Sequence, residues 1–296
     1  MFVKRNGKQR NRQSYKCNEC GYRWYDKPTR GKDTIQEIYK KYVCGRRVLK
    51  EIKDLHKLSI PTLNKMFDNY RVEFEIPEPT FAPVNLLYDA TFFGKEYGFI
   101  VFHDNKSVVY FEEIKTETII AVKQGLDKLR AKGYTFKSLT VDGKRGIIKM
   151  FEREFPNVPI QFCHFHQQAI IRRYITNNPK TECGIDIKIL MRDLKHSTIE
   201  EFALKLKELE KKHAIFIAEK NEKGDWKHKR IRSAIRSLKT NLPYLFAYKN
   251  YPSLDISNTT NKLEGLFAHL KEKVKIHRGL RTDRKKKMIR FILSIS

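Results

Sequence analysis

"LYDATFFGKEYGFIVF", residues 87–102, places Asp89 at the end of an apolar, aromatic-rich run and follows it with Thr91 and two phenylalanines, ahead of a short polar turn and a second apolar run. A carboxylate in apolar surroundings costs free energy unless it is paired, hydrogen-bonded or bound to a metal ion. Asp89 is therefore either a turn residue that follows a strand or one member of a site. The remainder of the chain decides between the two.

The segments around this stretch predict a mixed sheet. Apolar runs at 84–89, 97–102 and 107–111, separated by "FGKE" and "HDNK", are typical of three strands joined by hairpins, with Asp104 as a turn residue. A helix, a strand ending at Asp142, a helix, the strand "VPIQFC" and the helix "HFHQQAIIRRYI" follow. The order β-β-β-α-β-α-β-α predicts an α/β fold, a mixed sheet flanked by helices.

Outside this region the chain divides into further segments. We expect a basic half zinc ribbon at 1–32, a helix-turn-helix module at 33–72 and a proline-containing linker at 73–83. We expect the first part of the α/β core at 84–177, an all-helical insertion at 178–254, and a late helix of the core with a basic tail at 255–296.

The charge balance points to a polyanionic partner. The chain of 296 residues has 61 Lys and Arg against 34 Asp and Glu, a formal net charge of +27. The excess is concentrated at both ends, which favours attraction to phosphate. Solubility, association with the ribosome and binding to a membrane surface remain as alternatives.

Hydropathy and cysteine usage limit the location. There is no long apolar run and no secretory leader at "MFVKRNGKQRNRQ", so we expect a soluble, cytoplasmic protein with no membrane partner. The five cysteines are scattered and odd in number, which favours reduced thiols or metal ligation over a disulfide framework.

The N-terminal segments predict DNA recognition. Cys17 and Cys20 in "CNECG" form one knuckle of a zinc site, two ligands short of the four that Zn²⁺ needs; the alternative is a thiol pair in a loose basic arm. Two helices with a tight turn between them follow, with 61–69 as the recognition helix. Arg46, Arg47 and Lys65 are the candidate DNA contacts of this module.

Three acids stand out by their positions. Asp89 lies in the first strand, Asp142 ends the strand after the first crossover helix, and Glu264 lies on the late helix. In a sheet of this order the first and fourth strands can be neighbours, so their acids would meet at one edge. Converging carboxylates suit Mg²⁺ or Mn²⁺. Two such ions can activate a water or a 3′-hydroxyl and stabilise the leaving oxygen in phosphoryl transfer.

Four motifs carry a family resemblance: "DATFF" at Asp89, "TVDGKRG" at Asp142, "CHFH" at 163–166 and "TTNKLEG" at Glu264. From residue 85 onward the chain resembles the DDE transposases of bacterial insertion sequences, especially the Mutator-type group. The resemblance implies an RNase H-like core in which the three acids bind two divalent ions, and it matches Cys163 and His166 to the family's C-x-x-H pair. Relatives with a zinc ribbon usually carry two knuckles, whereas this chain shows one.

The resemblance also implies the reaction and its partners. A transposase binds the terminal repeats of its element, cuts double-stranded DNA and joins 3′-hydroxyls to target DNA, as a homodimer or larger assembly at the bacterial nucleoid. A catalytically inactive DNA-binding descendant and an RNase H-like nuclease that cleaves without joining are the alternatives.

Several further residues have two interpretations. Cys163 and His166 either support the acids structurally, which we favour, or bind zinc with His164. Glu264 is either solvated or a metal ligand flanked by Asn261, Lys271 and Lys275, of which the lysines would bind phosphate. Trp226 either stacks on an unpaired base or is a partly buried aromatic.

Overall fold

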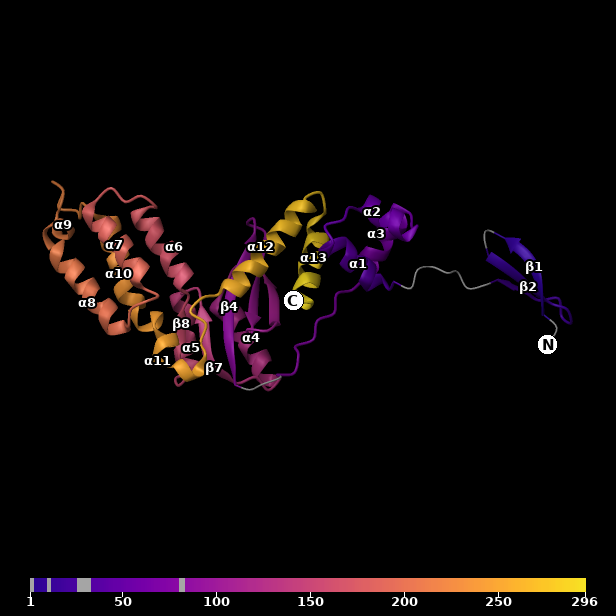
Figure 1. Cartoon of the computed structure of the whole chain (residues 1–296), viewed down its shortest axis with the longest axis horizontal. Helices are drawn as coiled ribbons and strands as arrows, with labels where there is room; N and C mark the ends of the chain where they lie inside the picture. The colour runs from indigo at the N-terminus through magenta and orange to yellow at the C-terminus, as the bar shows by residue number, and fades with distance from the viewer. Residues whose placement is uncertain (1–2, 10–11, 26–32, 80–82) are drawn as a thin grey trace. The chain divides into compact units, whose positions relative to one another are not determined.

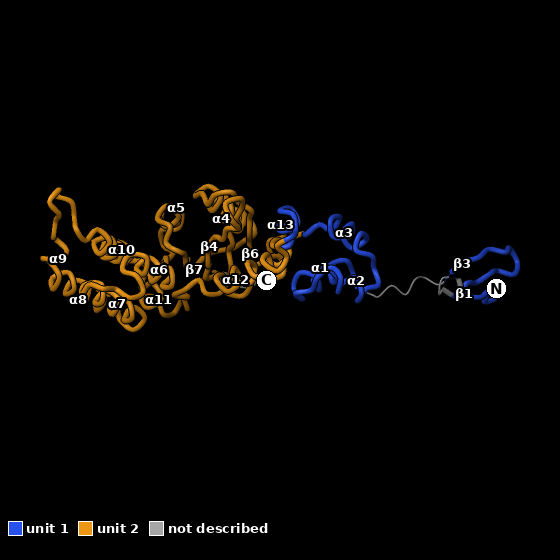
Figure 2. Tube along the Cα trace, turned by 90° about the horizontal axis from the view of Figure 1, so that it is seen from above, with its two compact units in different colours: residues 1–72, 279–288 blue, residues 73–278, 289–296 orange. Residues whose placement is uncertain are grey.

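A computed structural model describes residues 3–9, 12–25, 33–79 and 83–296, in two compact units that Figure 2 colours separately. Unit 1 comprises residues 1–72 and 279–288, and unit 2 comprises 73–278 and 289–296. Residues 1–2, 10–11 and 26–32 of the predicted ribbon, and 80–82 of the predicted linker, lie outside the described residues.

Unit 1 begins with a small antiparallel sheet. Strands β1 (Val3–Gln9), β2 (Arg12–Cys17) and β3 (Arg23–Tyr25) pair in the order β1-β2-β3. On β2 and β3 the rings of Tyr15 and Trp24 stack with centroids 5.9 Å apart. The alternative of a loose arm is therefore wrong for the described part of this segment.

Three helices follow: α1 (Ile35–Cys44), α2 (Leu49–His56) and α3 (Ile60–Asn69). The last two match the expected pair, and α1 precedes them. The side chain of Ser59 caps α3, and Pro61 stands in its first turn, where no backbone N–H is needed. The helices bury Tyr42, Ile52 and Phe67, whereas Val48 and Leu55 are half exposed.

The expected basic tail is a helix, α13 (Thr282–Ser294), and its first part belongs to unit 1. The guanidinium of Arg284 donates to both carboxylate oxygens of Asp68 at 2.7 and 2.6 Å and to Asn64 at 2.8 Å. Lys287 donates to the backbone oxygens of Phe67 and Asp68. These carbonyls end α3 and have no partner within it, so α13 serves as its C-terminal cap.

Unit 2 is built on a five-stranded sheet (Figure 1). Its strands are β4 (Val84–Phe93), β5 (Tyr97–His103), β6 (Val108–Ile114), β7 (Phe136–Val141) and β8 (Ile160–Phe162), in the order β6-β5-β4-β7-β8. The hairpin pairs are antiparallel, whereas β4–β7 and β7–β8 are parallel. The predicted mixed sheet is confirmed, and its first and fourth strands are neighbours.

Helices flank this sheet. The crossovers are α4 (Ile119–Ala131), α5 (Arg145–Glu154) and α6 (His164–Ile175), and α12 (Asn261–Ile276) packs against β4. Between α6 and α12 the chain is helical, as expected for 178–254. This part holds α7 (Glu182–Asp193), α8 (Ile199–Lys212), α9 (Ala214–Ala218), α10 (Lys229–Leu245), α11 (Ala247–Asn250) and η1 (Pro252–Leu254).

The predicted linker is packed where the structure describes it. Residues 73–79 are neither helix nor strand, but the ring of Phe74 lies 4.5 Å from that of Phe111, and the Tyr134 hydroxyl donates to the Pro77 oxygen. These contacts are with residues of unit 2, to which the segment belongs.

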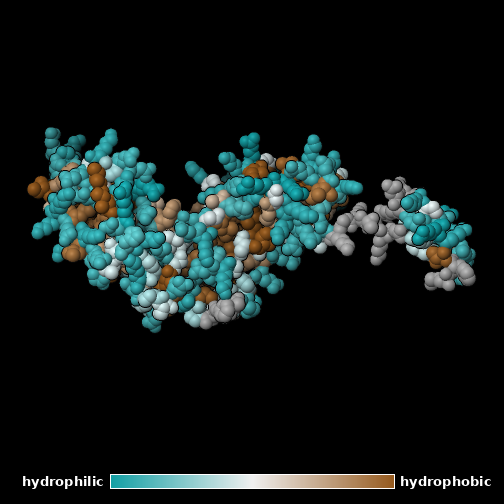
Figure 3. Space-filling view, viewed as in Figure 1, coloured by the Kyte–Doolittle hydropathy of each residue, from teal (hydrophilic) through white to brown (hydrophobic). Residues whose placement is uncertain are grey.

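The visible surface is mostly hydrophilic, with hydrophobic side chains gathered in separate patches (Figure 3). No helix in the described ranges combines the length and the apolar character that crossing a membrane requires.

Buried polar side chains of the sheet hold the chain where it returns from the helical insertion. The Asn85 amide donates to the backbone oxygens of Leu254 and Asp255 at 2.8 and 2.9 Å, and the Thr140 hydroxyl donates to that of Ser257 at 2.9 Å. Ser138 donates to Asn85 and fixes its amide orientation. This layer fixes the chain just ahead of α12.

We expect Thr140→Val to lower the free energy of unfolding by about 1–2 kcal/mol, because the Ser257 oxygen loses its buried donor while the side-chain shape is kept. Urea unfolding of the two proteins measures the difference. The matched control is Thr135→Val at an exposed position, for which we expect no more than about 0.5 kcal/mol. Equal losses for both variants would contradict a special role for Thr140.

Candidate metal centre

Asp89 lies within a strand and not at its end, contrary to the expectation from the apolar run. Strand β4 continues to Phe93, because its hairpin pairing with β5 extends to Phe93 and Tyr97. Its parallel pairing with β7 ends earlier, at Leu87 and Thr140. Asp89 is therefore just beyond the point where the neighbouring parallel strand stops, and its side chain is 5% exposed.

Asp142 follows the last residue of β7. Continuing the register of Leu87 and Thr140 by two residues brings Asp142 beside Asp89 on the same face of the sheet. Gly143 makes the turn possible, since its φ is +93° and a Cβ there would lie 1.9 Å from the Phe162 ring. The two carboxylates thus lie where the parallel pairing of β4 with β7 ends, beside the carboxyl end of β7, the edge at which α/β folds commonly bind ligands.

Burial and neighbouring carboxylates make both aspartates costly to ionise. Burial, followed by the charge of Asp142, raises the pKa of Asp89 to about 7, although His166 opposes the rise. Burial and the charge of Glu117 raise the pKa of Asp142. Shifts of this kind collect at functional sites, because like charges are held together there until a cation arrives.

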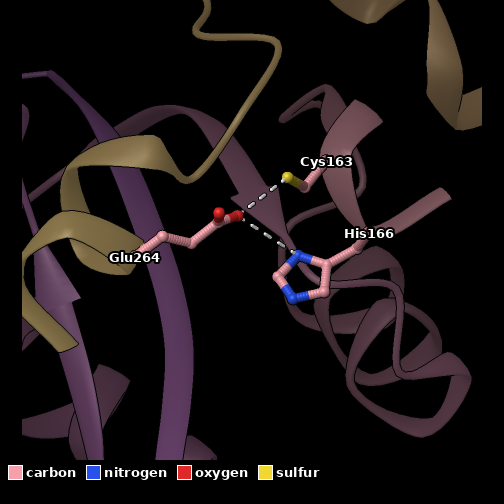
Figure 4. A group of neighbouring side chains, drawn as sticks. All are labelled: Cys163, His166 and Glu264. Atoms are coloured by element: carbon pink, nitrogen blue, oxygen red, sulfur yellow. Dashed lines mark hydrogen bonds and ion pairs between the residues drawn. The ribbon is translucent and has the colours of Figure 1, made fainter. Parts of the chain in front are cut away.

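Glu264, in the first turn of α12, points toward the start of α6 (Figure 4). Its Oε1 atom lies 3.8 Å from Nδ1 of His166, 3.9 Å from Sγ of Cys163 and 3.3 Å from the hydroxyl of Thr260. Its charge also raises the pKa of Asp89. All three predicted acids therefore share one electrostatic environment.

Cys163 has the surroundings of a structural thiol. It is fully buried, and its sulfur accepts hydrogen bonds from the backbone N–H and the hydroxyl of Thr260, both at 3.3 Å. Burial raises its thiol pKa, which disfavours the thiolate that zinc requires. The further ligand considered for zinc, His164, is engaged with the Leu245 oxygen at 2.6 Å. Cys163, His166 and Glu264 are close enough to share an ion. The contacts of Cys163 and His164 nevertheless favour a structural role for Cys163 beside Glu264 over zinc binding.

Three residues at the site were missed by the sequence interpretation or given no role. Thr91 is 2% exposed, and the alternation of β4 places it on the face of Asp89, which the period of two could have indicated. Thr260 links Cys163 to Glu264. Glu117 accepts from the Tyr88 hydroxyl at 2.7 Å and pairs with Lys144 at 3.0 Å; no sequence signal identifies it, because only the fold brings it to Asp142.

The residues present fit a hydrated divalent cation. Among the described residues, Oγ1 of Thr91 and Nδ1 of His166 are buried without a hydrogen-bond partner. Unpaired buried polar atoms in a native protein call for an unseen water or ion. Together with carboxylates of raised pKa, they form the oxygen-rich, partly hydrated surroundings that Mg²⁺ and Mn²⁺ prefer.

The other predicted contact residues lie on the surface. Asn261, Lys271 and Lys275 are exposed on α12, Lys65 is exposed on α3, and Arg46 and Arg47 are exposed between α1 and α2. Trp226 is 39% exposed, but its ring already lies 3.7 Å from the Arg232 guanidinium and 4.9 Å from the Lys220 ammonium. Asp104 is a hairpin residue as predicted, since its carboxylate accepts from the N–H groups of Lys106 and Ser107.

Cys17 and Cys20, the predicted knuckle, lie in a turn at the end of β2. Backbone N–H groups of Cys20 and Glu19 donate to Cys17 and lower its thiol pKa, which favours the thiolate. Gly21, with φ +72°, donates its N–H to the Cys17 oxygen at 3.1 Å. Within the described ranges, no third His, Cys, Asp or Glu joins the pair at metal-ligand distance.

A scan of the chain against models of known protein families finds no match, and a search of curated proteins finds no significant match either.

The burial of Asp89 predicts a pH-dependent stability. Folded Asp89 keeps its proton up to about pH 7, whereas the unfolded chain releases it near 4, so we expect the metal-free protein to lose stability as the pH rises between these values. The Asp89→Asn variant should not lose stability in this pH range, because its amide does not ionise. We expect it to exceed the wild type in free energy of unfolding by on the order of 2–4 kcal/mol at pH 8, with a much smaller gap at pH 5.

Chemical denaturation in EDTA at both pH values measures the effect. Asp104→Asn is the matched control, because an amide can still accept the two turn hydrogen bonds. A gap that is the same at pH 5 and pH 8, or that Asp104→Asn reproduces, would contradict the assigned pKa.

Zinc binding at the knuckle is a separate prediction. We expect Cys17→Ser to remove any zinc that co-purifies with the chain, whereas Cys44→Ser, altered on helix α1, retains it. Metal analysis by mass spectrometry after purification without chelator compares the variants. If Cys44→Ser loses its zinc while Cys17→Ser retains it, the zinc site is not at Cys17 and Cys20.

Proposed function

We propose that this protein is a DDE transposase with an RNase H-like catalytic core, which cuts the ends of its DNA element and joins them to target DNA. One observation carries the proposal: Asp89 and Asp142 lie where the parallel pairing of β4 with β7 ends, and α12 packs against β4 with Glu264 in its first turn. The order β6-β5-β4-β7-β8 supports it, because it makes the first and fourth strands neighbours.

The three acids would hold Mg²⁺ or Mn²⁺, in two ions, through Asp89, Asp142 and Glu264. When bound, the ions supply an activated oxygen nucleophile and stabilise charge on the leaving oxygen of the phosphodiester. The protein's own contribution is positioning. Strands β4 and β7 fix the aspartates, and Thr260 and Cys163 fix the region from which Glu264 acts.

The basic surface would bind the substrate. Unit 1 carries exposed Lys65, Arg46 and Arg47 on and beside its helices, and Lys271 and Lys275 are exposed on α12 beyond Glu264. Such cations bind phosphates without reading sequence, which suits a protein of net charge +27 acting on double-stranded DNA. Joining two element ends to a target needs two active sites, so a homodimer or larger assembly at the bacterial nucleoid follows from the proposal.

A strand-transfer assay tests this function. The substrates are labelled linear fragments that carry the genomic DNA on both sides of the coding sequence, with a supercoiled plasmid as target and Mg²⁺ or Mn²⁺. We expect joined products from the wild type. We expect at least a hundred-fold loss for Asp142→Asn and Glu264→Gln, because each removes a charged ligand from the site.

Matched measurements separate the possible outcomes. Asp104→Asn keeps its turn and is expected to join DNA at the wild-type rate, and Asp142→Asn is expected to keep wild-type DNA affinity. Cleavage without joining would support a nuclease instead. DNA binding without either reaction would support an inactive descendant. Joining of DNA by Asp142→Asn would contradict the assignment of the three acids as metal ligands.

A further inference from the structure

A hollow in the helical insertion lies apart from the acids, between α10 and the segment formed by α8 and α9. It has a volume of about 260 Å³ and is lined by Glu210, Ile217, Arg232, Ile235, Arg236, Lys239 and Thr240. Ligand sites in proteins begin at roughly 300 Å³, so the hollow can take part of a larger ligand that stays exposed. Three cations against one acid line it, which favours an anion.

The cations belong to one face of α10. Lys229, Arg232, Arg236 and Lys239 are three, four and three residues apart, the spacing that aligns side chains along a helix. Lys229 pairs with Asp225 at 3.3 Å and Lys239 with Glu210 at 3.1 Å, but exposed pairs of this kind are weak and exchange readily with another anion. The stripe is about 15 Å long, the length of four or five phosphates along one DNA strand.

Arg232 is fixed in place. Its guanidinium lies 3.7 Å from the centre of the Trp226 ring and donates to the backbone oxygen of Ile217 at 3.0 Å. Trp226 is held in turn by its bridge to Lys220 across a short turn. A cation ordered before the ligand arrives loses less entropy on binding. The tryptophan thus holds the arginine and does not offer that part of its ring to a base.

Arg236, one turn further along, is exposed, and no hydrogen bond or ion pair engages it within the described part of the chain. An arginine guanidinium presents several N–H groups in a planar fork that matches two phosphate oxygens. The hollow therefore combines a fixed guanidinium, an open one and an apolar floor of Ile217 and Ile235 that can pack against a sugar.

We infer that this face of α10 is a second DNA-binding site, which takes the phosphate backbone of duplex DNA independently of unit 1. The inference rests on the proposed function for the identity of the polyanion as DNA. It extends that function by assigning the helical insertion a direct part in holding the substrate, at a distance from the acids.

The experiment measures affinity of the full chain for a labelled 30-base-pair duplex and for the matching single strand, by fluorescence polarisation across a salt series. We expect Arg236→Gln to weaken duplex binding about 3- to 10-fold and to reduce the slope of log K against log salt by about 1. Arg232→Gln with Arg236→Gln is expected to reduce the slope by about 2. Arg153→Gln, a strongly exposed arginine on α5, is the charge-matched control and is expected to change neither.

A second variant tests the positioning role of the tryptophan. Trp226→Ala is expected to weaken duplex binding, because Arg232 loses the ring that positions its guanidinium. Trp226→Phe is expected to retain most of the affinity, because a ring face remains under the guanidinium. Thermal melting followed by circular dichroism confirms that each variant is folded.

The outcomes separate this inference from the proposed function. Unchanged duplex affinity and salt slope in folded Arg236→Gln would overturn the inference while strand transfer by the wild type still supports the transposase. Weakening confined to the single strand would overturn the duplex assignment. Weakened duplex binding in a chain that never cuts or joins DNA would support the second site and defeat the transposase. A wild type that binds neither probe would defeat both.

Discussion

The structure of unit 2 depends on a layer of buried hydrogen bonds between the sheet and the chain that returns to it. Asn85 and Thr140 stand on neighbouring parallel strands and hold the backbone oxygens of residues 254–257. The N–H of His164 holds the oxygen of Asn258 at 2.9 Å. Buried carbonyls need such partners, so the return path is fixed within narrow limits. Helix α12 begins at Asn261, three residues after Asn258. The hydrogen bonds of this layer therefore determine where Glu264 lies.

The same face of the sheet carries a cost. A buried aspartate, Asp89, lies beside a half-buried one, Asp142, and Glu117 adds a further carboxylate. In the described structure a buried histidine nitrogen and a buried threonine hydroxyl have no hydrogen-bond partner. Stability alone would not select this arrangement, since proteins usually pair or remove such groups. A site that holds like charges together lowers the free energy of unfolding but gains the capacity to bind a cation. The surrounding apolar strands must offset the lost free energy. Strand β5, buried along its whole length, is part of that support.

Some of the positively charged side chains of the protein stabilise its own fold. In unit 1, Arg284 and Lys287 are used to close the end of α3, so the basic C-terminal segment stabilises a helix that the sequence had assigned to DNA recognition. In unit 2, Arg232 is held by Trp226 and a backbone oxygen. A count of lysines and arginines therefore overstates the charge that is open to a partner, and only the contacts distinguish the two uses.

The sequence by itself determined the order of strands and helices in unit 2, because hairpin turns, alternating apolar runs and helical spacing are local signals. The order of elements allowed Asp89 and Asp142 to lie on neighbouring strands, and the pairing of β4 with β7 in the tertiary structure made them neighbours. It could not determine how far β4 runs past Asp89, because strand length is set by the partner strand across the hairpin. Nor could it give Glu117, Thr260 or the Arg232–Trp226 contact. Those were decided by the tertiary structure, because the groups that meet there lie far apart in the chain or depend on a side-chain orientation that no local pattern encodes.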